Sequence, residues 1–273
     1  MLRSMYTATG GLKSQQTKMD VIGNNIANVN TVGFKQGEAY FKEMLSQDMG
    51  ASAEGAPFNR QVGLGTMIGA IDTKFTQGAL QTTGRDLDFA IEGSGFFTVI
   101  TPDKLGDPET GLVDYGDADQ VSDLLYTREG IFSWNADGYL VTTDGNYVLG
   151  QDGTTIRMDE TVGNPAGAVQ VSTVLQMATF LNPAALSKGG SNNYSNTAAA
   201  GAPNFGASGT TVTDASGAEM SLGAVRSGFL EMSNVDLANE FTNMIITSRA
   251  YQSNSRVITK SDEMLQELTN LVR

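Results

Sequence analysis

Apolar residues recur every seven positions near both ends of the chain, a spacing that keeps them on one face of an α-helix. Near the N-terminus the repeat consists of Met5, Leu12, Met19 and Ile26, with Ile22 beside it. Near the C-terminus it consists of Leu230, Leu237, Met244, Tyr251, Ile258, Leu265 and Val272, with Phe241 beside it. No proline or glycine interrupts residues 235–271. The pattern therefore predicts a C-terminal helix of about 35 residues, roughly 50 Å long, which needs partners along its length.

The ends of these helices carry recognisable signals. The first helix is expected to stop near Asn28, Asn30 and Gly33, where glycine can adopt the left-handed conformation of a helix cap. Asp236 and Glu240 lie early in the second helix, where negative charge is favourable. The pattern leaves two alternatives, an intramolecular pair of helices or helices that pack with copies of the chain. We favour self-assembly, because the remaining faces of the second helix carry small and amide side chains that permit close approach.

Between the two helices the sequence has the texture of an antiparallel β domain. Strand-prone runs at 96–100, 139–142 and 168–172 are separated by the turn signals Asp137-Gly138, Asp144-Gly145 and Asp152-Gly153. Residues 187–219 are rich in small polar side chains and are predicted to be long loops. The expected core contains Phe89, Phe96, Phe97, Phe132 and Trp134.

These elements predict an α+β fold with three regions. Residues 1–33 and 230–273 form a terminal helical domain in which the helices pair like a coiled coil. Residues 34–74 form an extended connector, and residues 75–229 form the β-rich outer domain.

Composition excludes most enzyme classes. The 273 residues include no cysteine and no histidine, which removes disulfides, thiolate sites and imidazole catalysis. The net charge of −13 argues against nucleic-acid or anionic-membrane binding. Residues 1–49 carry five basic and four acidic residues, and residues 230–273 carry four and six, so the acidity lies in the middle. No apolar run is long enough to span a membrane or to form an ordinary signal peptide.

Candidate chemical motifs are weak. Gly63, Gly65 and Gly69 have the wrong spacing for a dinucleotide loop. The acidic run of Asp114, Asp117, Asp119 and Asp123 lacks the spacing and turn glycine of a calcium loop, so a solvated acidic loop is the better interpretation. We expect no catalytic residues, no metal site and no cofactor.

Long motifs at both ends and in the middle resemble one family. Residues 19–28 (MDVIGNNIAN) and 31–35 (TVGFK) closely resemble the N-terminal signature of bacterial flagellar rod and hook proteins, with Asn24, Asn25, Asn28, Gly33 and Phe34 as its signature residues. Residues 234–241 (NVDLANEF) and 249–254 (RAYQSN) resemble the closing helix of that family. Residues 87–97, 126–132 and 135–140 resemble its β domain.

The resemblance implies a structural subunit rather than an enzyme. Subunits of this family polymerise into helical tubes around an export channel, with paired terminal helices inside and the β domain outside. The implied partners are copies of the chain, neighbouring rod and hook–filament junction proteins, a hook cap and the type III export apparatus, with no nucleic acid and no membrane insertion. The implied location is the flagellum, outside the cell after export.

Two members of the family fit the chain. Residues 241–245 and 257–268 look closer to short hook proteins of the Gram-positive type. The length equally suits the distal rod. We expect the hook, a flexible coupling that transmits torque, with the rigid distal rod as the alternative. The expected contacts between subunits lie along the apolar repeats, from Met5 to Ile26 and from Leu237 to Leu265.

Overall fold

The chain folds into two compact units. The computed structural model describes residues 2–48, 61–105, 113, 115, 121–157, 174–213, 217 and 219–271. The helical unit comprises Met1–Ala27, Gln36–Lys74 and Val235–Arg273, and the β unit comprises Asn28–Lys35 and Phe75–Asn234. The chain therefore passes from one unit to the other at residues 27–28, 35–36, 74–75 and 234–235.

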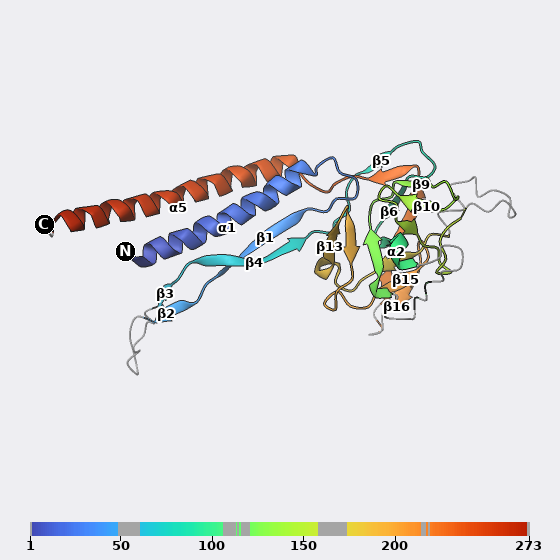
Figure 1. The fold of residues 1–273 in the computed structure, drawn as a ribbon, viewed down its shortest axis with the longest axis horizontal. Coiled ribbons are helices and arrows are strands. Elements are labelled where there is room, and N and C mark those ends of the chain that lie inside the picture. The colour runs from blue at the N-terminus through green and yellow to red at the C-terminus, as the bar shows by residue number, and fades with distance from the viewer. Residues whose placement is uncertain are drawn as a thin grey trace. The chain divides into compact units, whose positions relative to one another are not determined.

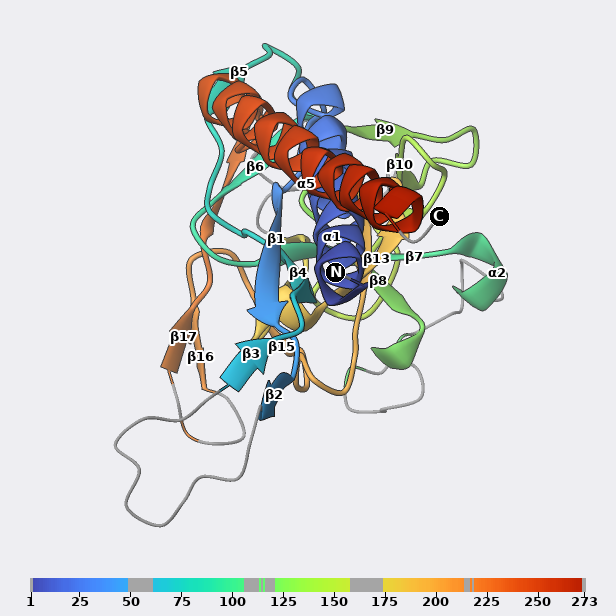
Figure 2. The same ribbon diagram turned by 90° about the vertical axis from the view of Figure 1, so that its left-hand side faces the viewer.

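In the helical unit, one helix lies between a second helix and a β-hairpin (Figure 1). The elements are α1 (Leu2–Ala27), α5 (Leu237–Leu271), β1 (Gly37–Glu43), β4 (Thr66–Thr73), β2 (Ser46–Asp48) and β3 (Gln61–Gly63). β1 pairs antiparallel with β4, and β2 pairs antiparallel with β3. Figure 2, turned by 90°, also shows α5 running alongside α1. Much of the segment expected to be an extended connector is thus a β-ribbon that packs on α1.

Small and polar residues form part of the contact between α1 and α5. The Oγ atoms of Ser4 and Ser261 lie 3.4 Å apart. A Cβ atom placed on Gly11 would lie only 2.7 Å from Nδ2 of Asn254, so glycine permits the close approach. Deeper in the pair, Nδ2 of Asn25 donates to Oε2 of Glu240 at 3.3 Å. These contact residues on α1 are Ser4, Gly11 and Asn25, spaced by seven and fourteen, and none of them belongs to the predicted apolar repeat.

The predicted apolar repeat is therefore only partly covered. Ile22 is buried, whereas the other members on α1 are half-buried: Met5, Leu12, Met19 and Ile26. On α5, Met244, Ile258 and Leu265 are half-buried, and Leu237, Phe241 and Tyr251 are exposed. A coiled-coil seam is not confirmed, because small side chains bring the axes together while larger ones remain at the edge. The α+β class and the packing of the two terminal helices are confirmed.

The helix ends correct two expectations. α1 ends at Ala27, and Gly33, with φ at +70°, lies six residues further on in the β unit rather than at the helix cap. α5 begins at Leu237, where the Asp236 carboxylate accepts from the backbone N–H of Ala238 at 2.9 Å and caps the helix. Leu230, the first member of the predicted C-terminal repeat, lies in a strand instead, and Val272 lies outside the described residues.

The β unit is built from short strands, all paired antiparallel. Its strands are β5 (Leu80–Thr82), β6 (Phe89–Glu92), β7 (Phe96–Ile100), β8 (Leu124–Thr127), β9 (Phe132–Trp134), β10 (Leu140–Thr142), β11 (Tyr147–Val148), β12 (Met177–Thr179), β13 (Ser187–Gly190), β14 (Asn193–Ser195), β15 (Asn204–Gly206), β16 (Thr211–Thr213), β17 (Glu219–Ser221), β18 (Ala224–Ser227) and β19 (Phe229–Glu231). The main sheet runs β13-β14-β8-β7-β11-β10-β9, and β12 pairs with β7 and β15. Smaller pairs join β16 to β17, β18 to β6 and β19 to β5. Two short helical turns, α2 (Pro102–Leu105) and η1 (Pro183–Ala185), complete the described elements.

Strand β7 is the centre of the core because both of its faces are buried. Phe96 and Ile100 point into one hydrophobic cluster, and Phe97 and Val99 point into another. This division follows the period of two along a strand. The aromatic residues expected in the core are confirmed there, with Trp134 partly buried at its edge.

The turn and loop predictions have mixed outcomes. The strands at 96–100 and 140–142 are confirmed, and 168–172 lies outside the described residues. Each predicted Asp-Gly turn is present, but only its glycine has positive φ. The turns are therefore not of the type in which both central residues are left-handed. The prediction of long loops at 187–219 is wrong, because β13 to β17 begin in this segment and pair with neighbours that supply the hydrogen bonds.

We predict that Tyr126→Phe leaves the free energy of unfolding at pH 7 unchanged or raises it by about 1 kcal/mol, because this buried hydroxyl has no hydrogen-bond partner within the described residues. Burial raises the pKa of Tyr126 above its ordinary value of 10.0. Above about pH 10 the unfolded chain loses this proton while the folded chain keeps it. The free energy of unfolding of the wild type therefore falls as the pH rises. The variant lacks the part of this decrease that comes from Tyr126.

Urea unfolding of the full chain near pH 7 and pH 11 measures both effects. Tyr115→Phe is the matched control, because its hydroxyl donates to the Gly150 carbonyl at 2.7 Å. The control should lose about 1 kcal/mol. Equal losses in the two variants would contradict the prediction.

Candidate functional site

The helical unit exposes an unusual amount of apolar surface. We call the exposed large apolar side chains of its helices and β-ribbon the apolar surface; they are Tyr6, Tyr40, Phe41, Met44, Leu45, Val62, Leu64, Met67, Ile71, Leu237, Phe241, Ile245, Ile246, Tyr251, Val257, Met264, Leu268 and Leu271. Ile245 is 63% exposed and Ile246 is 59% exposed, in the middle of α5. Scattered apolar residues are ordinary on a monomer, but a set of this size on one unit is typical of a protein–protein interface.

The C-terminal part of α5 extends past its partner helix. The contact between Ser4 and Ser261 lies near the first described residue of α1, so residues 262–271 continue beyond it, as Figure 1 shows. Met264, Leu268 and Leu271 are exposed on this extension. Apolar residues on a helix without a neighbouring helix gain stability only when another surface covers them.

A buried carboxylate, that of Glu240, connects three segments of the helical unit: the end of α1, the start of β1 and the first turn of α5. Glu240 is 2% exposed, and its Oε1 accepts from Nε2 of Gln36 at 2.6 Å. Its Oε2 accepts from Asn25, which also donates to the Gly37 carbonyl at 2.9 Å and accepts from the Gly37 N–H at 3.0 Å. The end of α1, the start of β1 and the first turn of α5 are thereby held by one network.

The β unit contains a second network, which is charged. It lies near the residues at which the chain enters and leaves this unit. The Glu231 side chain is completely buried and lies 2.5 Å from Nζ of Lys35 and 3.0 Å from Nη1 of Arg128. The same carboxylate accepts from the Gly78 N–H at 2.9 Å, and Lys35 also donates to the Thr76 carbonyl at 2.9 Å. Segments 28–35, 75–79 and 228–234 are therefore joined by one carboxylate.

Burial controls the electrostatics of this network. Desolvation lowers the pKa of Lys35, and the nearby Arg128 lowers it further, while Glu231 opposes both effects. Breaking a buried pair by removing one partner leaves an uncompensated charge and is strongly destabilising. Glu231 is consequently the residue on which both buried cations depend.

The family-signature residues lie in both units. In α1, Asn25 belongs to the Glu240 network, and Asn24 is exposed. In the β unit, Asn28 accepts from the Thr31 hydroxyl at 3.1 Å, and Phe34 is buried beneath the ammonium of Lys188. The remaining signature residue is Gly33, whose added Cβ would lie 2.8 Å from the Glu129 nitrogen, so no larger residue fits.

Asn25 was expected as a signature residue and Glu240 as an early residue of the helix, but the two buried networks and the roles of Lys35, Arg128 and Glu231 were not predicted from the sequence. Lys35 directly follows the apolar and small residues Val32, Gly33 and Phe34, which is an available signal for a buried charge, whereas Arg128 lies next to Glu129 and has no such signal. Glu240 was expected to favour the helix N-terminus through its charge, but its side chain is turned into the unit interior. Their partners are 196, 103 and 215 residues distant along the chain, which no local pattern reveals.

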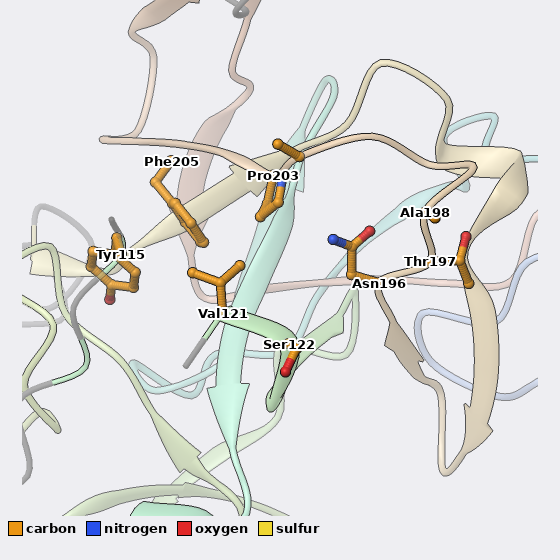
Figure 3. Close-up of a pocket in the computed structure, with 9 residues that line it drawn as sticks. Tyr115, Val121, Ser122, Asn196, Thr197, Ala198, Pro203 and Phe205 are labelled. Atoms are coloured by element: carbon orange, nitrogen blue, oxygen red, sulfur yellow. The ribbon is translucent and has the colours of Figure 1, made fainter. Parts of the chain in front are cut away.

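One cavity of the β unit is shown in Figure 3. A cavity of about 380 Å³ in the β unit has the rings of Tyr115 and Phe205 at one end and Asn196 and Thr197 at the other (Figure 3). Its described lining carries no carboxylate, ammonium or guanidinium group. Within the described residues, no group of three acidic side chains is placed to hold a metal ion, and no helix is long and apolar enough to cross a membrane.

This α+β chain has buried polar networks that hold its segments together and a large apolar surface on its helical unit. This combination is typical of a self-assembling structural subunit. Comparison with known proteins identifies which kind. The "Flagella basal body rod protein" family matches residues 5–35, the "Flagellar hook protein FlgE/F/G D1 domain" family matches 118–174, and the "Flagellar basal body rod FlgEFG protein C-terminal" family matches 226–271. The chain belongs to the flagellar rod and hook protein family, as its motifs indicated.

Relatives cover the chain from end to end. It is 44% identical to the flagellar basal-body rod protein FlgG of Bacillus subtilis, over 100% of both chains. It is 37% identical to FlgG of Agrobacterium fabrum, over 96% of this chain and 97% of the relative. The flagellar hook protein FlgE of Borreliella burgdorferi is 26% identical, over 99% of this chain and 100% of the relative.

The comparisons establish a structural subunit of the flagellum, in a family that is not enzymatic. Proteins of this family polymerise and associate with other axial proteins. The expectation of a hook protein is not supported, since higher identity is found to basal-body rod proteins than to the hook relative.

We predict that Glu231→Ala lowers the free energy of unfolding of the β unit by about 3–5 kcal/mol, because it strands two buried cations. Glu92→Ala is the matched control, since it also removes one carboxylate from an ion pair, with Arg226, but both partners are about half exposed. The control should lose at most about 1 kcal/mol. Urea unfolding of the full chain, followed by the fluorescence of Trp134, separates the two; similar small losses would show that the network is not important for stability.

Proposed function

We propose that this chain is the subunit of the distal rod, the rigid drive shaft of the flagellar basal body. The observation that carries the proposal is end-to-end similarity to basal-body rod proteins at up to 44% identity. The hook relative is aligned over 449 positions, far more than the 273 residues here. The length of the chain and the sequence identities therefore both favour the rod over the hook.

The helical unit is proposed to form the inner tube of the polymer, and the β unit its outer part. Apart from Ile22, which is already buried, the residues of the apolar repeats on α1 and α5 are half-buried or exposed in the single chain, so copies of the chain can cover them. The contact is expected to be head-to-tail, since the extension at residues 262–271 offers one surface and the β-ribbon another. A heterologous contact that does not close produces an open helical polymer. The expected contact residues are Met5, Leu12, Met19, Ile22, Ile26, Leu237, Phe241, Met244, Tyr251, Ile258 and Leu265.

Torque transmission is proposed to depend on the two buried networks. Each network ties together the chain segments through which its unit is connected to the rest of the polypeptide. Buried polar groups that are paired resist separation because an unpaired charge in a low-dielectric interior is costly. Such networks favour a subunit that transmits force without changing its own conformation.

The proposed partners follow from this position. They are copies of the chain, neighbouring rod proteins on one side and hook proteins on the other, and the type III export apparatus during delivery. A cap protein at the growing tip is a further proposed partner. Nucleic acids and anionic membranes are not among the proposed partners, because the net charge of −13 repels their phosphate groups.

We predict that Ile245→Asp reduces polymerisation at least about tenfold while leaving the β unit folded, because it places a charge in the apolar surface. Ser255→Asp adds the same charge to an exposed polar position on the same helix and should assemble far better. Sedimentation of the two variants measures assembly, and circular dichroism with Trp134 fluorescence checks folding. Normal assembly of Ile245→Asp would contradict a role for this surface.

We predict that polymers of the purified protein are straight, stiff tubes of uniform diameter. Electron micrographs of negatively stained polymers give the curvature along each tube. Tubes that curve and change curvature with salt or pH would overturn the rod assignment and restore the hook, whereas the absence of any tube would count against an axial role.

A further inference from the structure

The helical unit has a groove where α1 meets the β-ribbon. Its volume is about 330 Å³, and Met44, Met67 and Ile68 form its apolar part. Met44 is 41% exposed and Met67 is 43% exposed, so the groove is open to the surface. Ser14 and Thr66 also line it, and Oγ of Ser14 donates to the Thr66 carbonyl at 3.3 Å, which connects the helix to the ribbon. Flexible methionine side chains are well suited to a binding surface.

The charge beside the groove is positive. Lys13 is the one charged residue among its described lining residues, and the Lys13 side chain is exposed. It forms no ion pair within the part of the chain that the structure describes. The whole of α1 carries three basic residues and one acidic residue. The groove therefore favours an apolar partner that has a negative charge beside its apolar face.

The end of α5 has the complementary pattern. Met264, Leu268 and Leu271 follow the spacing i, i+4, i+7, which places them on one face of the helix, and each is exposed. This spacing is typical of a helix that binds in an apolar groove. Glu267 lies beside the same face, three residues after Met264 and four before Leu271, and its side chain is exposed. Residues 262–271 carry three acidic residues and no basic residue, so their charge is opposite to that of α1.

The end of α5 does not reach the groove of its own chain. Asn254 lies beside Gly11 and Ser261 lies beside Ser4, so α5 runs along α1 toward the N-terminus of α1. It continues as one helix to Leu271, and its last ten residues, about 15 Å long, extend past α1 and away from the groove (Figure 1). A second copy of the chain is therefore needed to bring such a segment to the groove.

We propose that the groove binds residues 262–271 of a second copy of this chain. The exposed apolar face of that segment packs on Met44 and Met67, and Glu267 pairs with Lys13 across the contact. Burial of apolar side chains supplies the affinity, and the charge pair sets the position of the helix in the groove. Each copy has one groove and one free helix end, so the contact repeats head-to-tail without closing. This contact rests on the proposed function, because it is the contact through which copies polymerise.

Introduced cysteines test the contact directly, because the wild-type chain has none. Polymers of the double variant Met67→Cys and Leu268→Cys should give a ladder of covalent oligomers on a non-reducing gel after mild oxidation. The matched control combines Met67→Cys with Asp262→Cys, since residue 262 lies on the other side of the helix from Met264 and Leu271. The control should give at least about tenfold less cross-linked dimer, because a disulfide forms only over a short distance.

Two outcomes of the cysteine experiment would overturn the contact. Ladders of equal strength in the test variant and the control would show that the apolar face of α5 is not the face that enters the groove. A cross-link confined to single chains, which gives no ladder, would show that the occupant is the chain's own helix end.

Exchange of the two charges tests the ion pair. Lys13→Glu and Glu267→Lys should each raise the protein concentration needed for polymerisation about tenfold at low salt, because two like charges then meet. The variant that carries both changes should polymerise like the wild type. Asp262→Lys is the matched control for Glu267→Lys, and it should raise this concentration at most about twofold because it lies off the contact face. A double variant no better than the single variants would overturn the pairing.

Sedimentation of the wild type separates this contact from the proposed function. A wild type that stays monomeric at every concentration would overturn both. Wild-type polymers without the ladder in the cysteine variant would overturn the contact alone. A ladder in polymers that curve would support the contact and count against the rod.

Discussion

The structure depends on a carboxylate that has no access to water. The Glu231 carboxylate is buried in the β unit, where Lys35, Arg128 and a backbone N–H surround it. These partners come from segments far apart in the sequence, so the requirement to neutralise one buried charge holds together the segments at which the β unit begins and ends. In the helical unit, Glu240 performs the corresponding role with the amides of Asn25 and Gln36. Each compact unit thus has its own buried network that holds its chain segments together.

A second constraint explains why the helices are suited to assembly. The contacts between α1 and α5 include serine, glycine and asparagine residues. These small and polar residues let the two helix axes approach closely. Leu237, Phe241 and Ile245 consequently remain exposed in the single chain. Their burial is available to copies of the chain, as polymerisation through this surface requires.

Sequence similarity favours the rod over the hook among the axial proteins. Identity is higher to basal-body rod proteins than to the hook relative, and the described β unit is a multi-stranded antiparallel body with two buried clusters on either face of β7. The hook expectation rested on short stretches of α5, which rod and hook proteins share. Such stretches identify the family but discriminate poorly among its members, because one C-terminal model named for FlgEFG matches this region.

The sequence alone determined the two terminal helices, the β-rich middle with its aromatic core, and the family, because these depend on local periodicity and on long contiguous motifs. It did not determine which helix residues meet. Periodicity marks a face as apolar but does not distinguish an internal seam from an external surface, and the small residues of the actual contact carry no hydrophobic signal. The strands between 187 and 219 and the pairing of Lys35 and Arg128 with Glu231 were likewise decided only in three dimensions. Their partners lie many residues away, and polar side chains become strand or network residues only when the fold supplies the groups that satisfy them.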